Sequence, residues 1–181
     1  MVDDAKERLY MKDLYCSYYT ESDEITSYMI SKLNIKDNDI ILEPSAGEGI
    51  FIDGIINQQK NIQIDALDIN EKAVNILKKK YLDMPNVRVR LTDTLLDRQL
   101  DMYADRQLWL KITDTLEDKE LDYISDKGGY YDKIIGNPPY GANIDDLVSL
   151  YEELYPNTSH GYKDIYKYFY DFGLSICKNN G

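Results

Sequence analysis

The tetrapeptide Asn137-Pro138-Pro139-Tyr140 combines residue types that can hold a flat heterocycle bearing an amino group. It follows the apolar run 133–136, which predicts a strand, so the tetrapeptide lies where a strand ends and a loop begins. Each proline fixes its own φ and lacks a backbone donor, and a residue before proline is pushed into an extended conformation. The loop is therefore stiff and presents an amide, free carbonyl oxygens and an aromatic ring. Taken alone, the tetrapeptide is more typical of an ordinary Pro-Pro turn.

A second segment, residues 40–56, has the form of a ligand-binding strand, turn and helix. An apolar strand leads into Pro44-Ser45-Ala46-Gly47-Glu48-Gly49, which we name the glycine turn, and an apolar helix follows. Glycines here let the backbone approach a bound nucleotide closely. Ile52 stands where the dinucleotide fingerprint has its last glycine, and a Gly-x-Gly pair alone is weak evidence.

Acidic side chains follow the next two predicted strands. The strand over 62–67 runs into Asp68, about twenty residues after the glycines, the spacing at which an acid accepts hydrogen bonds from ribose hydroxyls. The strand over 87–91 precedes Thr92-Asp93-Thr94. Ligands of an open parallel sheet lie at the carboxyl ends of its strands, and all these residues occupy such ends. Each acid by itself could also be a cap or a surface residue.

Strands and helices alternate along the chain. Strands are expected at roughly 39–43, 62–67, 87–91 and 132–136, and helices at about 22–34, 49–59, 71–82 and 163–178. At least one further helix is expected within 97–130. This alternation predicts an α/β fold with a doubly wound, mostly parallel sheet. Residues 111–116 nearly repeat 90–95, and we take the earlier copy as the end of the third strand because it directly follows the second crossover helix.

These motifs, in this order, resemble S-adenosylmethionine-dependent adenine-N6 DNA methyltransferases of restriction–modification systems. The match covers Glu43–Gly49, Leu67–Asn70, Thr92-Asp93 and the Asn-Pro-Pro-Tyr loop, in the gamma arrangement, where cofactor motifs precede the catalytic one. Tyr18-Tyr19-Thr20 resembles the N-terminal cofactor motif of that group, although Glu21 replaces its usual proline. Lys163-Asp164-Ile165-Tyr166 resembles the segment after the catalytic loop.

The resemblance implies a Rossmann-like methyltransferase fold, S-adenosylmethionine as cofactor, and methyl transfer to the N6 amino group of adenine in DNA. The catalytic residues that it implies are Asn137, Pro138, Pro139 and Tyr140. The cofactor-binding residues that it implies are Tyr19, Thr20, Glu43, Pro44, Ser45, Ala46, Gly47, Gly49, Asp68, Ile69, Asp93, Thr94 and Asn137. Near the catalytic loop, Tyr151, Tyr162 and Tyr166 are further, weaker candidates for stacking on a base.

With 181 residues, the chain is expected to form one domain. Residues 1–36 are expected to be an N-terminal helical segment, and 97–130 an acidic insertion, since 97–126 holds nine acids against four bases. The family's fold implies further strands after the helix at 163–178 and a separate target-recognition domain. The sequence is therefore interpreted as a cofactor-and-catalysis half, incomplete at its C-terminus. The loop 141–161 is rich in Asn, Asp, Ser and Gly, which favours mobility.

The net charge of −12 opposes an unaided grip on DNA, because phosphate contacts supply most non-specific affinity. We expect double-stranded DNA to be held through a separate recognition region. The sheet edge that the missing later strands would leave unpaired also predicts self-association or a completing partner chain. The only histidine is His160, and Cys16 and Cys177 lack metal-ligand spacing, so no metal is expected. Without a signal peptide or a membrane-spanning run, a cytoplasmic location without a membrane partner is expected.

Three alternatives stay open. The same loop serves methyltransferases that act on ribosomal RNA or on a protein glutamine, because those amino groups pose the same chemical problem. The chain could also be a module that binds cofactor or a partner chain and transfers nothing. A nicotinamide oxidoreductase is the third alternative, but it leaves the prolyl loop unexplained.

Overall fold

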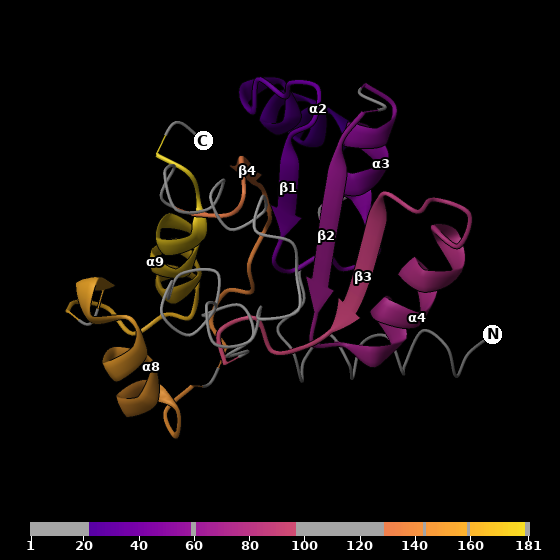
Figure 1. Cartoon of the computed structure of the whole chain (residues 1–181). Coiled ribbons are helices and arrows are strands. Elements are labelled where there is room, and N and C mark those ends of the chain that lie inside the picture. The colour runs from indigo at the N-terminus through magenta and orange to yellow at the C-terminus, as the bar shows by residue number, and fades with distance from the viewer. Residues whose placement is uncertain (1–21, 59–60, 97–128, 143, 159, 180–181) are drawn as a thin grey trace, which may run out of the picture.

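The computed structural model describes residues 22–58, 61–96, 129–142, 144–158 and 160–179. Their elements, in chain order, are α2 (Asp23–Lys32), β1 (Ile40–Glu43), α3 (Ile50–Ile56), β2 (Gln63–Asp68), α4 (Glu71–Lys80), β3 (Val87–Leu91), β4 (Lys133–Ile134), α8 (Val148–Leu154), the 3-10 helix η1 (Pro156–Thr158) and α9 (Tyr166–Ile176) (Figure 1). Tyr19, Thr20, the second copy at 111–116 and nearly all of the predicted acidic insertion lie outside the described residues.

The four strands form one parallel sheet in the order β3-β2-β1-β4. Leu42 of β1 is paired with Asp65 of β2 on one side and with Ile134 of β4 on the other. The direction of winding reverses between β1 and β4, which makes this the switch point where open α/β sheets bind their ligands. The predicted α/β class and the parallel sheet are confirmed, and each predicted strand is present.

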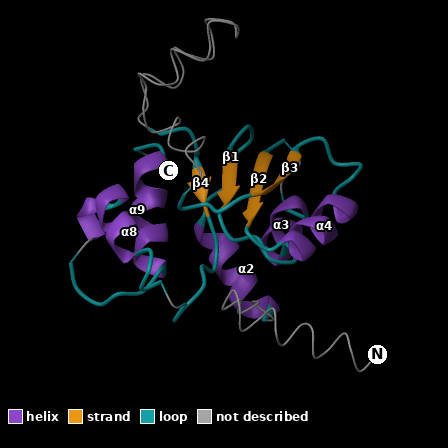
Figure 2. Ribbon diagram, turned by 90° about the horizontal axis from the view of Figure 1, so that it is seen from below, coloured by secondary structure: helices purple, strands orange, loops and turns teal. Residues whose placement is uncertain are grey.

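Helices cover both faces of the sheet. Ile41, Ile64 and Ala66 pack in one core cluster with side chains of α2, α3 and α4. Leu42 and Leu67, which alternate with them along the strands, pack with side chains of α8 and α9 on the other face. Both faces of β1 are thus buried, which explains its nearly continuous apolar sequence. Figure 2 shows α8 and α9 beside the β4 end of the sheet and α3 and α4 beside the β3 end.

The helix starts follow local signals. The Ser22 hydroxyl oxygen accepts a hydrogen bond from the N–H of Ile25 at 3.3 Å and caps α2. The side-chain oxygen of Asn70 accepts one from the N–H of Lys72 at 3.0 Å and caps α4, a position at which asparagine is favoured. By contrast, α3 begins directly after Gly49, without a side-chain cap.

The segment 141–161 contains an element that its polar composition did not predict. Helix α8 buries Val148 and Tyr151, and Tyr155 is buried directly after it. These side chains share a core cluster with Tyr168 and Phe172 of α9. Polar residues separate these buried positions, so the sequence shows no clear apolar face. The face is formed by the packing of α8 against α9.

After α9 the chain returns to the sheet beside β4. Cys177 forms a parallel bridge with Tyr131, and the N–H of Lys178 donates to the carbonyl oxygen of Tyr131 at 2.9 Å. The Lys178 ammonium also lies 2.7 Å from the Asp132 carboxylate. Because β4 pairs with β1 on its other side, this bridge adds backbone at the position where the family resemblance implies a further strand. Among the described residues, no helix has the length and apolar character needed to cross a bilayer.

Candidate functional site

The carboxyl ends of the four strands meet along one edge of the sheet (Figure 1). The N–H of Ala46, in the glycine turn, donates to the carbonyl oxygen of Leu67 at 2.8 Å. The N–H of Thr92 donates to the carbonyl oxygen of Asp68 at 2.9 Å, and that of Ile135 donates to Leu42 at 3.0 Å. These bonds bring the glycine turn, Asp68, the loop after β3 and the start of the prolyl loop to a common edge.

Two glycines of the glycine turn have left-handed backbone conformations. Gly47 has φ +53° and Gly49 has φ +83°. Side chains with a Cβ rarely adopt these torsions, so the turn depends on glycine at both positions. The N–H of Gly49 donates to the carbonyl oxygen of Ala46 at 2.8 Å, which closes the turn tightly.

Asp68 fastens the glycine turn to the end of β2. One carboxylate oxygen accepts from the N–H of Gly47 at 2.7 Å, and the other accepts from the N–H of Asn70 at 2.7 Å. Burial raises the pKa of Asp68, while the backbone N–H groups of Asn70, Gly47 and Ile69 oppose this rise. The Ile69 side chain is about half exposed beside it. A carboxylate has further lone pairs, so Asp68 can hold the turn and still accept from ribose hydroxyls.

Glu43 ends β1 with a buried carboxyl group. Among the described residues, its Oε2 atom and the Ser45 hydroxyl have no hydrogen-bond partner. Burial, followed by the charges of Asp68 and Asp53, raises the pKa of Glu43 well above its ordinary value, and Lys80 opposes the rise. A buried polar atom without a partner is costly. The two groups therefore fit a polar ligand, and the amino group of the methionine part of S-adenosylmethionine provides suitable donors.

The residues after β3 support the same turn. The Thr94 hydroxyl is buried and donates to the carbonyl oxygen of Pro44 at 2.6 Å. An Asp93 carboxylate oxygen accepts from the N–H groups of Leu95 at 3.0 Å and Leu96 at 3.3 Å. Thr94 thus reaches the first residue of the glycine turn, and Asp93 caps the loop that carries it.

The prolyl loop starts against the glycine turn. A Cβ placed on Gly136 would lie 3.2 Å from Cδ of Pro44 and 3.3 Å from Oγ of Ser45, so only glycine fits here without displacing a neighbour. Asn137, Pro138 and Pro139 are half-buried, and Tyr140 is 48% exposed. The structure therefore places the candidate catalytic loop directly beside the candidate cofactor turn.

The tyrosines near this loop differ in their exposure. The Tyr140 and Tyr166 rings lie 5.9 Å apart between centroids and are tilted by 43°, and Tyr162 is 84% exposed. Tyr151, in contrast, is buried against Tyr168, with ring centroids 5.0 Å apart, and burial raises its pKa to about 12. Including Tyr151 among the stacking candidates was therefore wrong, because its ring belongs to the core between α8 and α9.

Two polar networks were not predicted from the sequence. Asp65, buried in β2, accepts from Arg88 at 2.6 and 2.9 Å and from the hydroxyl of Tyr131 at 2.8 Å. The hydroxyl of Tyr81, directly after α4, contacts Asp53 and the carbonyl oxygen of Gly49 behind the glycine turn. A tyrosine at a core position needs a hydrogen-bond partner for its hydroxyl, and this requirement was the sequence signal for such a network.

A metal centre has no support in the part of the chain that is described. No group of three or more His, Cys, Asp or Glu side chains there is arranged to hold an ion.

Comparisons with known proteins identify the family of the chain. Residues 62–181 match the family model of the Eco57I restriction-modification methylase. The Type II methyltransferase M.AccI of Acinetobacter calcoaceticus is 28% identical over 145 residues, which cover 78% of this chain and 22% of that protein. The chain therefore spans less than a quarter of the length of this relative.

The solved structures that the chain matches include two methyltransferases. The tRNA m1G37 methyltransferase of M. jannaschii has 21% identity and a TM-score of 0.38, covering 75% of this chain and 42% of its own. A putative sarcosine dimethylglycine methyltransferase of Galdieria sulphuraria has 14% identity and a TM-score of 0.44. The match covers 83% of this chain and 54% of that chain. Because the family model matches more than half of its length, the chain belongs to the Eco57I restriction-modification methylase family.

Proposed function

We propose that this chain is the cofactor-binding and catalytic part of a methyltransferase that modifies the N6 amino group of adenine in DNA. Family membership supports S-adenosylmethionine as the cofactor and a restriction–modification context. The observation that carries the proposal is the contact between the two loops, with Gly136 held against Pro44 and Ser45. This contact puts a loop suited to an amino-bearing ring next to a turn suited to a nucleotide.

In this proposal the carboxyl edge binds the cofactor along its length. Glu43 and the glycine turn hold the methionine part, since they offer a buried unpartnered carboxyl oxygen and left-handed backbone. Asp68 accepts from the ribose hydroxyls, and Ile69, Asp93 and Thr94 lie toward the adenine ring. Tyr19 and Thr20 are proposed cofactor contacts from outside the described residues. When bound, S-adenosylmethionine supplies a methyl group on a sulfonium, which is an excellent leaving group.

The protein's task is then to orient a weak nucleophile. The lone pair of the adenine amino group is delocalised into the ring. The side-chain oxygen of Asn137 and the carbonyl oxygen of Pro138 would accept the two amino hydrogens and direct the lone pair toward the methyl group. Orientation and fixed dipoles carry most of such a mechanism, so no strong general base is needed.

Tyr140 is proposed to stack on the target base. An adenine inside a duplex cannot reach the prolyl loop, so it must leave the base stack. With 48% of its surface exposed, Tyr140 can replace part of the lost stacking, an effect of about 1–3 kcal/mol per base. The net charge of −12 suggests that the duplex is gripped by a separate recognition region or a partner chain.

The test is a transfer assay that identifies the product. The purified chain is incubated with methyl-labelled S-adenosylmethionine and unmethylated duplex DNA, and the DNA is digested to nucleosides for mass spectrometry. We expect N6-methyldeoxyadenosine, and we expect Asn137→Ala to bind cofactor normally by calorimetry but to form no product. Label found only in RNA or on a protein glutamine would contradict the DNA assignment. Cofactor binding without any transfer would favour a non-catalytic module.

A further inference from the structure

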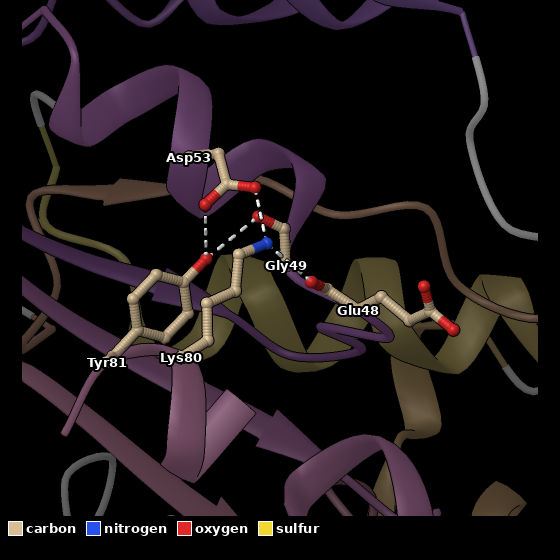
Figure 3. Close-up of polar contacts among 5 residues, drawn as sticks. All are labelled: Glu48, Gly49, Asp53, Lys80 and Tyr81. Atoms are coloured by element: carbon tan, nitrogen blue, oxygen red, sulfur yellow. Dashed lines mark hydrogen bonds and ion pairs between the residues drawn. The ribbon is translucent and has the colours of Figure 1, made fainter. Parts of the chain in front are cut away.

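A set of polar side chains lies behind the glycine turn, on the side of α4 (Figure 3). The Tyr81 hydroxyl contacts Oδ1 of Asp53 at 2.8 Å and the carbonyl oxygen of Gly49 at 3.1 Å. The same carbonyl oxygen accepts from the N–H of Asp53 at 3.0 Å. Lys80 donates to the carbonyl oxygen of Glu48 at 3.1 Å and to the second carboxylate oxygen of Asp53. We name Asp53, Lys80 and Tyr81 the turn brace.

The turn brace acts where the turn is conformationally demanding. Gly49 has a left-handed φ of +83°, and a Cβ there would lie 2.6 Å from the Tyr81 hydroxyl oxygen and 2.7 Å from Leu77. The tyrosine thus occupies the space beside Gly49 and binds its carbonyl oxygen. Since α3 has no side-chain cap at its start, these contacts hold the junction between the turn and the helix.

The turn brace is also electrostatically linked to the unpartnered carboxyl group in the site. Asp53 raises the pKa of Glu43 and Lys80 lowers it, after the dominant effect of burial, so both charges act on Glu43. The Tyr81 hydroxyl is itself kept protonated, because burial and its bond to Asp53 raise its pKa. It therefore stays a donor over the whole working pH range.

We propose that Tyr81, oriented by Asp53, is a positioning residue that sets the glycine turn for the methionine part of the cofactor. This inference rests on the proposed function. Lys80 and Asp53 are both partly exposed, so their ion pair contributes little by itself. The hydroxyl of Tyr81 is the buried member. Its single proton is shared between Oδ1 of Asp53 and the carbonyl oxygen of Gly49, so its removal takes a donor from both acceptors.

The test separates the two ends of the cofactor. Affinities for S-adenosylhomocysteine, which carries the amino-acid part, and for 5′-methylthioadenosine, which lacks it, are measured by calorimetry. Tyr81→Phe should weaken S-adenosylhomocysteine binding by about tenfold, the effect of losing one hydrogen bond, and leave 5′-methylthioadenosine binding unchanged. A general loss of stability would weaken both ligands together.

Tyr131→Phe is the matched control. Its hydroxyl is also buried and donates to an aspartate, Asp65, at 2.8 Å, but Tyr131 belongs to the core cluster on the other face of the sheet from Tyr81. It should leave both affinities unchanged. Asp53→Ala leaves the hydroxyl proton to the Gly49 carbonyl oxygen alone, so it should weaken S-adenosylhomocysteine binding less than Tyr81→Phe does.

The outcomes distinguish this inference from the proposal beneath it. If the unmodified chain binds S-adenosylhomocysteine and Tyr81→Phe binds it equally well, the positioning role is overturned and the proposed function stands. Equal weakening of both ligands by Tyr81→Phe also overturns the positioning role. If the unmodified chain, folded by circular dichroism, binds neither ligand, the proposed function fails as well.

Discussion

The carboxylate of Asp68 accepts a hydrogen bond from the backbone N–H of Gly47 at 2.7 Å. The acid that ends β2 therefore also holds the turn that follows β1. Its second oxygen is bonded to the N–H of Asn70, which joins the start of α4 to the same carboxylate. A ligand bound along this edge would contact a turn, a strand end and a helix start that Asp68 already holds together.

Replacing Asp68 should therefore remove both a ligand contact and a support of the turn. We expect Asp68→Ala to weaken S-adenosylmethionine binding at least tenfold, because hydrogen bonds to a charged group contribute about 1.5–3 kcal/mol. Isothermal titration measures the affinity. Asp83→Ala, on an exposed side chain after α4, is the control and should bind normally. Undiminished binding by Asp68→Ala would remove Asp68 from the cofactor site.

Glu43 should make stability depend on pH. Its pKa is raised in the folded chain, mainly by burial, so it binds a proton more tightly there than in the unfolded chain. Its contribution to stability is thus fully present below its ordinary pKa of 4.5 and is lost as the pH rises through the folded value. Glu43→Gln should therefore gain melting temperature relative to the unmodified chain as the pH increases.

Thermal unfolding at a series of pH values measures this difference. Glu48→Gln, on the exposed side chain in the same turn, is the control and should change stability little. A difference between Glu43→Gln and the unmodified chain that stays constant with pH would show that burial does not perturb this carboxyl group.

Thr94 should support the glycine turn through its hydroxyl. Thr94→Val keeps the shape but leaves the Pro44 carbonyl oxygen without this donor, which should lower the free energy of unfolding by about 1–3 kcal/mol. Thr94→Ser keeps the hydroxyl and should lose less. Denaturant unfolding measures both variants, and a Thr94→Val variant as stable as the unmodified chain would mean that the bond to Pro44 contributes nothing.

Tyr140 should matter for transfer and not for cofactor binding. Tyr140→Ala removes a stacking surface of about 1–3 kcal/mol, which corresponds to a loss of about 5- to 150-fold in transfer to DNA. Tyr140→Phe keeps the ring and should retain activity. S-adenosylmethionine affinity should be the same in both. A Tyr140→Ala variant that transfers at the normal rate would show that the base does not stack on this ring.

The outer edge of β3 should promote self-association. Among the described strands, β3 pairs only with β2. The charge of Arg88 on β3 is neutralised by its ion pair with Asp65, so it protects the edge less. An edge of unpaired backbone groups templates association unless charges protect it. We expect concentration-dependent association by light scattering, reduced by Leu91→Lys on the exposed end of this edge. A monodisperse monomer at high concentration would contradict this prediction.

Much of the fold was predictable because it depends on local pattern. The strand at 87–91 has the bounds that its apolar and polar residues predicted. Strand β4 is shorter than predicted, because only Lys133 and Ile134 pair with β1. Helix α8 escaped prediction, because its few buried positions stand among acids and become a core face only against α9.

The sequence by itself determined the features set by local stereochemistry: left-handed glycines at 47 and 49, a stiff prolyl loop after a strand, and the order of the motifs. The tertiary structure decided which of these meet. It placed Gly136 against Pro44, used the Tyr81 hydroxyl to hold Gly49, and buried Tyr151 in the core. The physical reason is that such contacts join residues far apart in the chain. They depend on the order and register of the parallel strands, which no local preference specifies.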